Sequence, residues 1–317
     1  MKHNHAIDQN LLAIFGRNRL VGRIALLLII VPGLACSHFA QRPAGQRAGN
    51  VQNQNLGRIE PAQRDEYTTI YYKSGRLNIE AYLYKPLKGE APFPLVIYNH
   101  GSRAGNERAE IPFRYVANVL AAEGYAVLVP ERRGYGKSDG PTYTEEVSSK
   151  GGDVMIRRFE EESDDVLAAL DYLKTLGFID NRRMAIMGWS HGGVAAVLTA
   201  SRSHAFVAMI DQAGGALTWN NSPALQQKLT SAARNISIPS LCMDAENDAT
   251  TEAAKTVCNA IPVDSSEKKT IIYPPFTPGR PTNHAPGHNI FSAEGMPIWE
   301  NDVLAFLRAR LRVMRNE

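Results

Sequence analysis

The stretch GWSHGG at residues 188–193 holds a serine with a glycine two places away on each side. Gly188, Ser190 and Gly192 match the pattern G-x-S-x-G, which raises a serine hydroxyl above a sheet when it lies in a tight strand-to-helix turn. Glycine suits the flanking positions because a Cβ atom there would collide with neighbouring backbone. The apolar run 184–187 supplies the strand, so the pattern predicts a nucleophilic serine. The alternative is a glycine-rich packing turn whose serine does no chemistry.

A serine hydroxyl is a weak nucleophile until a histidine accepts its proton and a carboxylate orients that histidine. When the serine lies in such a turn, the acid and the base follow it along the chain. Asp248 comes a few residues after the apolar run 238–243. We expect Asp248 to be the acid because the loop must extend outward before a carboxylate can face the base. Asp244 and Glu246 lie nearer to the run and are the alternatives.

Two histidines near the C-terminus could act as the base. His284 and His288 both lie in the proline-rich loop that follows the apolar run 270–273. His288 differs from His284 because it follows Gly287 and precedes an apolar pair at 290–291.

The elements that must position these residues alternate between strands and helices. Segments 67–72 and 77–84 alternate between apolar and polar residues around a turn, which predicts a hairpin at a sheet edge. Continuously apolar runs predict strands that are covered on both faces, as in a parallel sheet; they lie at 95–98, 125–129, 184–187, 206–210, 238–243 and 270–273. Helical spacing is found between them, at 113–123, 161–175, 194–201, 224–233, 251–260 and 297–312. The order predicts an α/β fold with a mostly parallel central sheet, helices on both faces and an N-terminal antiparallel hairpin at one edge.

With these elements the chain resembles the α/β-hydrolases, in particular their dienelactone hydrolase-like and prolyl-oligopeptidase-like branches, from about Tyr67 to the C-terminus. The resemblance rests on the serine motif and on four further motifs in the family's order: NHGS at 99–102, PERRGYGKS at 130–138, AEND at 245–248 and GH at 287–288. True dienelactone hydrolases use a cysteine nucleophile, whereas position 190 is serine. This difference argues against dienelactone as the substrate.

The resemblance implies a role for residues of each motif. It places the acid at Asp248 and the base at His288, and it leaves His284 as a solvated loop residue. The intermediate of acyl transfer needs preorganised N–H donors for its oxyanion. The backbone N–H of His191, directly after the nucleophile, is one expected donor. The family's H-G-x step implies Ser102 as the second, with Arg103 as the alternative.

The substrate is less well defined by the sequence. Trp189 and Trp219 are expected to line an acyl or aromatic pocket, although ordinary packing is an equal alternative for both. Only residues 212–223 are available for a lid between a strand and the next helix, so we expect an open site. The polar segment 141–160 is expected to form a flap over the entrance.

We therefore expect a serine hydrolase, close to a carboxylesterase, that cleaves a small or medium ester through a Ser-His-Asp triad and an acyl-enzyme. The alternatives are a peptidase that acts on short peptides and a catalytically idle binding protein with the same fold. No cofactor is expected, and the cysteines lack the spacing of a zinc site. The expected partner is a small-molecule ester or short peptide, and membrane contact is expected only through an N-terminal lipid.

The N-terminus predicts export. Basic residues precede the apolar run 24–31 and small residues follow it, as in a secretory signal peptide. We expect a signal peptide at 1–35, a polar tether at 36–64 and a catalytic domain at 65–317. Cys36 resembles the cysteine of a lipoprotein cleavage box, which would make the protein periplasmic or membrane-anchored. Ordinary cleavage after Ala35, with small residues at 33 and 35, is an equal alternative, and an uncleaved short anchor is another. The whole net charge of +3 lies before residue 36, and a neutral remainder argues against nucleic-acid binding.

Export also suggests a disulfide, because exported proteins meet oxidising conditions. Cys242 lies in the strand before the acid loop, and Cys258 lies in the helix expected to pack beside it. A bridge between them would stabilise the fold by roughly 3 kcal/mol. The alternative is that both are small buried hydrophobic residues.

Overall fold

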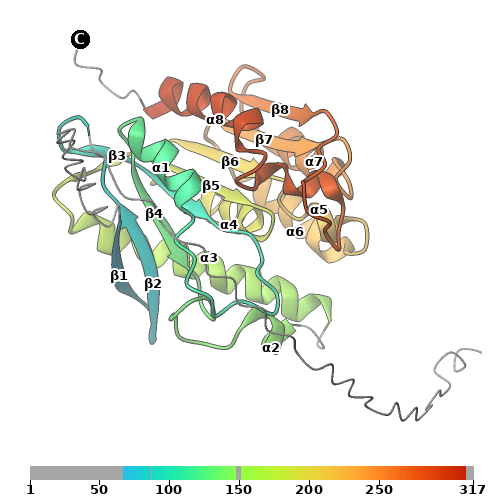
Figure 1. The fold of residues 1–317 in the computed structure, drawn as a ribbon, viewed down its shortest axis with the longest axis horizontal. Coiled ribbons are helices and arrows are strands. Elements are labelled where there is room, and N and C mark those ends of the chain that lie inside the picture. Colours follow the sequence, from blue (N-terminus) through green and yellow to red (C-terminus); the bar gives the residue numbers. More distant parts are fainter. Residues whose placement is uncertain (1–66, 87, 148–150, 312–317) are drawn as a thin grey trace, which may run out of the picture. The chain divides into compact units, whose positions relative to one another are not determined.

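A computed structural model describes residues 67–311 except for residue 87 and residues 148–150 (Figure 1). The predicted signal peptide and tether lie outside the described residues. The described strands form one eight-stranded sheet in the order β1-β2-β4-β3-β5-β6-β7-β8. They are β1 (Tyr67–Ser74), β2 (Leu77–Tyr84), β3 (Phe93–Asn99), β4 (Ala126–Glu131), β5 (Ile179–Trp189), β6 (Ala208–Gln212), β7 (Ser240–Ala245) and β8 (Lys268–Tyr273).

The sheet is parallel from β4 to β8, whereas β1 and β2 form an antiparallel hairpin at one edge. The predicted fold class is confirmed, including the position of the hairpin. The helices are α1 (Arg114–Ala122), α2 (Tyr143–Val147), α3 (Gly152–Lys174), α4 (His191–Ala200), α5 (Ala216–Trp219), α6 (Pro223–Ala233), α7 (Glu252–Ala260), the 3₁₀ helix η1 (Pro286–Phe291) and α8 (Met296–Leu311).

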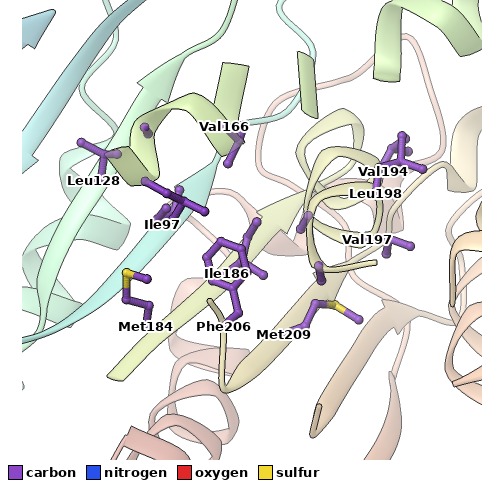
Figure 2. Packing of buried hydrophobic residues seen from close by; sticks show 14 of the residues in the cluster. Ile97, Leu128, Val166, Met184, Ile186, Val194, Val197, Leu198, Phe206 and Met209 are labelled. Atoms are coloured by element: carbon purple, nitrogen blue, oxygen red, sulfur yellow. The ribbon is translucent and has the colours of Figure 1, made fainter. Parts of the chain in front are cut away.

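Both faces of the sheet are buried. One core lies between the sheet and the face that carries α3, α4, α6 and α7; Figure 2 shows Ile97, Ile186 and Met209 of the sheet beside Val166 and Val194 of the helices. The other core lies under α1 and α8. Successive residues of one strand, such as those of β3, alternate between the two cores. This double burial explains why a central strand such as β3 is apolar at successive positions.

The longest helix differs most from expectation. Helix α3 begins at Gly152, whereas the apolar spacing predicts a start at 161. The buried face of the early turns includes charged side chains such as Arg158, so it does not show the apolar spacing that marks a helix in the sequence. Most described residues of the expected flap at 141–160 form α2 and the first turns of α3, and its position over the entrance stays a prediction.

Cys242 on β7 and Cys258 on α7 are both buried and both free thiols. They contact each other in a small cluster with Ala254. The predicted disulfide is thus not formed in the structure, and the alternative of small buried side chains describes both positions. Within the part of the chain that the structure describes, no helix is both long enough and apolar enough to cross a membrane.

Candidate active site

Ser190 lies at the junction of β5 and α4 with φ 57° and ψ −117°. A positive φ is costly for a residue with a side chain and persists only where the surroundings impose it. A Cβ atom on Gly188 would lie 2.1 Å from the Gly192 carbonyl oxygen, and one on Gly192 would lie 1.9 Å from the Asn99 carbonyl oxygen. The two flanking glycines are therefore required by backbone contacts across the turn.

The Ser190 hydroxyl is joined to two side chains from distant loops. Its Oγ lies 2.8 Å from Nε2 of His288, and Nδ1 of His288 lies 2.6 Å from Oδ2 of Asp248. The His288 and Asp248 side chains are 2% and 0% exposed. A carboxylate only accepts hydrogen bonds, so Nδ1–H of His288 donates to Asp248 and leaves Nε2 able to accept the Ser190 proton. This chain can generate a serine nucleophile.

The loops that carry the acid and the base are tied to each other. Asn247 exchanges two hydrogen bonds with the backbone of Phe276, at 2.8 and 2.9 Å. A Cβ atom on Gly287 would lie 2.4 Å from Oδ1 of Asn247, which is why the residue before His288 is glycine. Asn247 was not predicted from the sequence, because its position beside Asp248 gives no sign of a partner that far along the chain.

The alternative acids do not reach the base. Asp244 is fully buried, and its Oδ1 accepts a hydrogen bond of 2.8 Å from the N–H of Ala245. Burial and the nearby charge of Asp248 raise the pKa of Asp244, which favours its neutral form. Glu246 is exposed. The alternative base, His284, is also exposed, and its ring packs edge-on against His288 with 5.5 Å between the ring centroids.

Two backbone segments flank Ser190 where an oxyanion would form. His191 is the first residue of α4, where N–H groups have no acceptor within the helix and the helix dipole favours negative charge. On the other side, a Cβ atom on Gly101 would lie 3.5 Å from the Cβ atom of Ser190. Ser102 follows Gly101 and is exposed. Arg103, the alternative donor, has a side chain that binds Glu131.

The two tryptophans have different surroundings. Trp189 is half-buried, and its Nε1–H donates a hydrogen bond of 3.1 Å to the carbonyl oxygen of His288. The sequence pattern gave no sign of this bond, because it joins residues 99 positions apart. Trp219 is 6% exposed and packs in the core with Leu225 and Leu229. Trp189 thus binds the backbone of His288, and Trp219 packs in the core.

Comparison with known proteins gives one family match and several relatives. Residues 112–235 match the prolyl oligopeptidase family. Over 143 residues the chain is 31% identical to the quorum-quenching protein AidA of Acinetobacter baumannii, a match that covers 45% of this chain and 42% of AidA. The chain therefore spans less than half the length of this curated relative.

Solved structures share the fold over most of the described residues. The acylaminoacyl peptidase of Pyrococcus horikoshii has 19% identity and a TM-score of 0.55, and the match covers 79% of this chain and 42% of that chain. Est1E of Butyrivibrio proteoclasticus, solved with bound ferulic acid, has 18% identity and a TM-score of 0.57; the match covers 77% of this chain and 99% of that chain.

Proposed function

We propose that this chain, which is an α/β-hydrolase of the prolyl-oligopeptidase-like kind, is a serine hydrolase that cleaves a small or medium carboxylic ester. The observation that carries the proposal is the hydrogen-bonded chain from Ser190 through His288 to Asp248, with 2.8 and 2.6 Å between the bonded atoms. The three residues lie in separate segments that follow the carboxyl ends of β5, β7 and β8.

In the proposed mechanism, His288 Nε2 accepts the Ser190 proton while Oγ attacks the ester carbonyl carbon. The backbone N–H groups of His191 and Ser102 donate to the oxyanion that forms, and Asp248 stabilises the protonated His288. His288 then gives its proton to the leaving alkoxide, which leaves an acyl group on Ser190. Water then gives a proton to His288 and attacks the acyl carbonyl carbon. The bond to Ser190 Oγ breaks, His288 returns its proton to Oγ, and the carboxylic acid is released.

Short peptides are the second candidate substrate. The match to the prolyl oligopeptidase family and the fold shared with an acylaminoacyl peptidase favour them. The likeness to Est1E supports the ester, because that match covers 99% of the Est1E chain and only 42% of the peptidase chain. An open site, which we expect because only residues 212–223 are available for a lid, suits either substrate class.

The test is hydrolysis of p-nitrophenyl esters of increasing acyl length beside matched peptide p-nitroanilides, with fluorophosphonate labelling of the serine. We expect faster cleavage of the esters. Ser190→Ala and His288→Ala should each lower kcat by about 10⁴-fold or more, and Asp248→Asn should lower it somewhat less, because triad residues act as a unit.

His284→Ala is the matched control, because this histidine lies in the same loop and contacts His288 without contacting Ser190. Its kcat should stay within about threefold of the parent protein, since it removes only a ring contact. Full activity in Ser190→Ala, or a severe loss in His284→Ala with none in His288→Ala, would overturn the assignment. Preferential cleavage of the anilides would select the peptidase.

A further inference from the structure

Three charged side chains are completely buried beside α4. Arg132, Arg158 and Glu162 are each 0% exposed. Glu162 accepts a hydrogen bond of 2.7 Å from Nε of Arg132 at Oε2 and one of 2.8 Å from Nε of Arg158 at Oε1. Removing such a group from water is expensive, and well-packed apolar residues can often replace it without loss of stability. Stability alone therefore does not account for these buried charges, whereas the geometry that they impose could.

Glu162 is joined to the residue that follows the nucleophile. Nε2 of His191 lies 2.7 Å from Oε2 of Glu162. Burial lowers the pKa of His191, and the Glu162 carboxylate only partly offsets this. Burial alone would raise the pKa of Glu162, but His191 and Arg132 outweigh it and the pKa lies well below its ordinary value. A neutral His191 therefore donates Nε2–H to an ionised Glu162, and this bond fixes the first residue of α4.

Glu162 also reaches the other side of the site through Arg132. Nη2 of Arg132 donates a hydrogen bond of 2.9 Å to the carbonyl oxygen of His100. This carbonyl begins the segment that leads through Gly101 to Ser102. Gly192 packs against the same carbonyl, since a Cβ atom there would lie 2.6 Å from it. The segment is thus held between α4 and the Arg132 guanidinium.

We propose that Glu162 is a positioning residue for the oxyanion hole, because it holds the His191 N–H through the His191 ring and the Ser102 N–H through Arg132 and the His100 carbonyl. The inference rests on the proposed function. Glu162 touches neither Ser190 nor the base among its recorded bonds. It acts by fixing the separation of two backbone donors that belong to different loops.

The catalytic consequence follows from the geometry of electrostatic stabilisation. Donors act on an oxyanion only when they are aimed at it before the reaction, and loss of one donor typically costs about 10²- to 10³-fold in kcat. Loosening the support of a donor that is still present should cost less than its removal. The ground-state ester gains little from these donors, so KM should change little.

The experiment compares Glu162→Gln and His191→Phe with a matched control, Asp165→Asn. Asp165 lies in the same helix, is 0% exposed and binds the neighbouring Arg133 at 2.9 Å, but has no recorded bond to His191 or His100. His191→Phe keeps the backbone N–H and the aromatic contacts with Tyr143 and Phe159, and it leaves Glu162 with both arginines.

The readouts are kcat and KM on a p-nitrophenyl ester and the inhibition constant of a trifluoromethyl ketone. In the inhibited complex Ser190 Oγ bonds to the ketone carbon, its proton moves to His288 and the former carbonyl oxygen becomes the oxyanion. We expect kcat to fall by about 10-fold in His191→Phe and by about 10- to 100-fold in Glu162→Gln, with KM within about twofold. Affinity for the ketone should fall in parallel with kcat/KM, and the pH profile should keep its shape.

Asp165→Asn should lose stability without these kinetic changes. If both test variants match Asp165→Asn in kcat and ketone affinity, the inference is wrong while the proposed function stands. If Glu162→Gln does not fold, His191→Phe alone decides, because its buried ion pairs are intact. If the parent protein neither cleaves esters nor binds the ketone, the proposed function itself fails.

Discussion

The pKa values of buried carboxyl groups in this fold shift in opposite directions according to their neighbours. Glu162 is ionised because His191 and two arginines surround it. Among the described residues, no cation acts on the pKa of Asp211, near the end of β6. Its Oδ1 accepts a hydrogen bond of 2.9 Å from the N–H of Gly214, and its Oδ2 has no hydrogen-bond partner among the described residues. Burial raises the pKa of Asp211 to about 7.

The raised pKa of Asp211 predicts a loss of stability as the pH rises. Below pH 4 the carboxyl is protonated in both the folded and the unfolded chain, so it costs nothing. Between about pH 4 and pH 7 the unfolded chain ionises while the folded chain does not, and the free energy of unfolding falls. Asp211→Asn keeps an oxygen for Gly214 and removes the titration. Relative to the parent, it should gain stability with rising pH, by up to about 4 kcal/mol at pH 7.

Urea unfolding of both proteins at several pH values measures this difference. A stability difference that does not change between pH 4 and pH 7 would show that Asp211 titrates normally in the fold. Asp180→Asn is a suitable comparison, because the hydrogen bonds of Asp180 with Arg182 and Arg183 lower its pKa against the effect of burial. That variant should lose stability relative to the parent once the pH exceeds about 4.

At the scale of elements, the site depends on the contact between the start of α4 and the end of β3. Gly192 Cα approaches the backbone of Asn99 and His100 so closely that no Cβ atom fits. Gly192→Ala should therefore force the two elements apart. We expect a loss of at least about 3 kcal/mol in the free energy of unfolding, beyond ordinary overpacking, because backbone atoms must move.

Gly177→Ala is the control for this prediction, because nothing lies within 4 Å of the Cβ position there and the backbone has no positive φ. It should leave stability within about 1 kcal/mol of the parent or raise it slightly. Denaturant unfolding and ester turnover measure both variants. A Gly192→Ala protein with parental stability and turnover would mean that the contact is looser than the structure shows.

Much of the fold was predictable because its signals are local. The parallel strands contain short apolar runs, the hairpin strands alternate between apolar and polar residues, and the order of elements follows from these patterns. Each glycine that flanks Ser190 has a steric reason. The charged start of α3 was missed because ion pairs such as Arg158–Glu162, rather than apolar residues, fill its buried face. The partner of the His191 ring was missed because Glu162 lies 29 positions earlier, and no local pattern marks such a pair.

At the scale of the whole molecule, we propose that the protein is exported and that a lipid on Cys36 anchors it to a membrane. The support is in the sequence alone: basic residues, the apolar run 24–31 and a cysteine after small residues. The neutral charge of the chain after residue 35 agrees with a catalytic domain that does not itself bind an anionic surface.

This proposal predicts that the mature chain begins at Cys36 and sediments with membranes. Cys36→Ser should move the protein to the soluble fraction, because two or more acyl chains are needed for stable anchoring and none would be attached. Ser37→Ala, one position further, should remain with the membranes. Mass spectrometry of the purified protein gives the first residue, and an intact Met1 would rule out cleavage.

The bond from the Trp189 indole to the His288 carbonyl, 3.1 Å long, gives the molecule an optical reporter. Indole emission responds to hydrogen bonding and to nearby polar groups, and this ring lies 5.9 Å from the His288 ring between centroids. Trp189 precedes the proposed nucleophile, so its indole contacts the residue proposed to activate that nucleophile. Protonation of the imidazole in the proposed mechanism should therefore change the Trp189 contribution to the intrinsic fluorescence, with Trp219 and Trp299 as the other emitters.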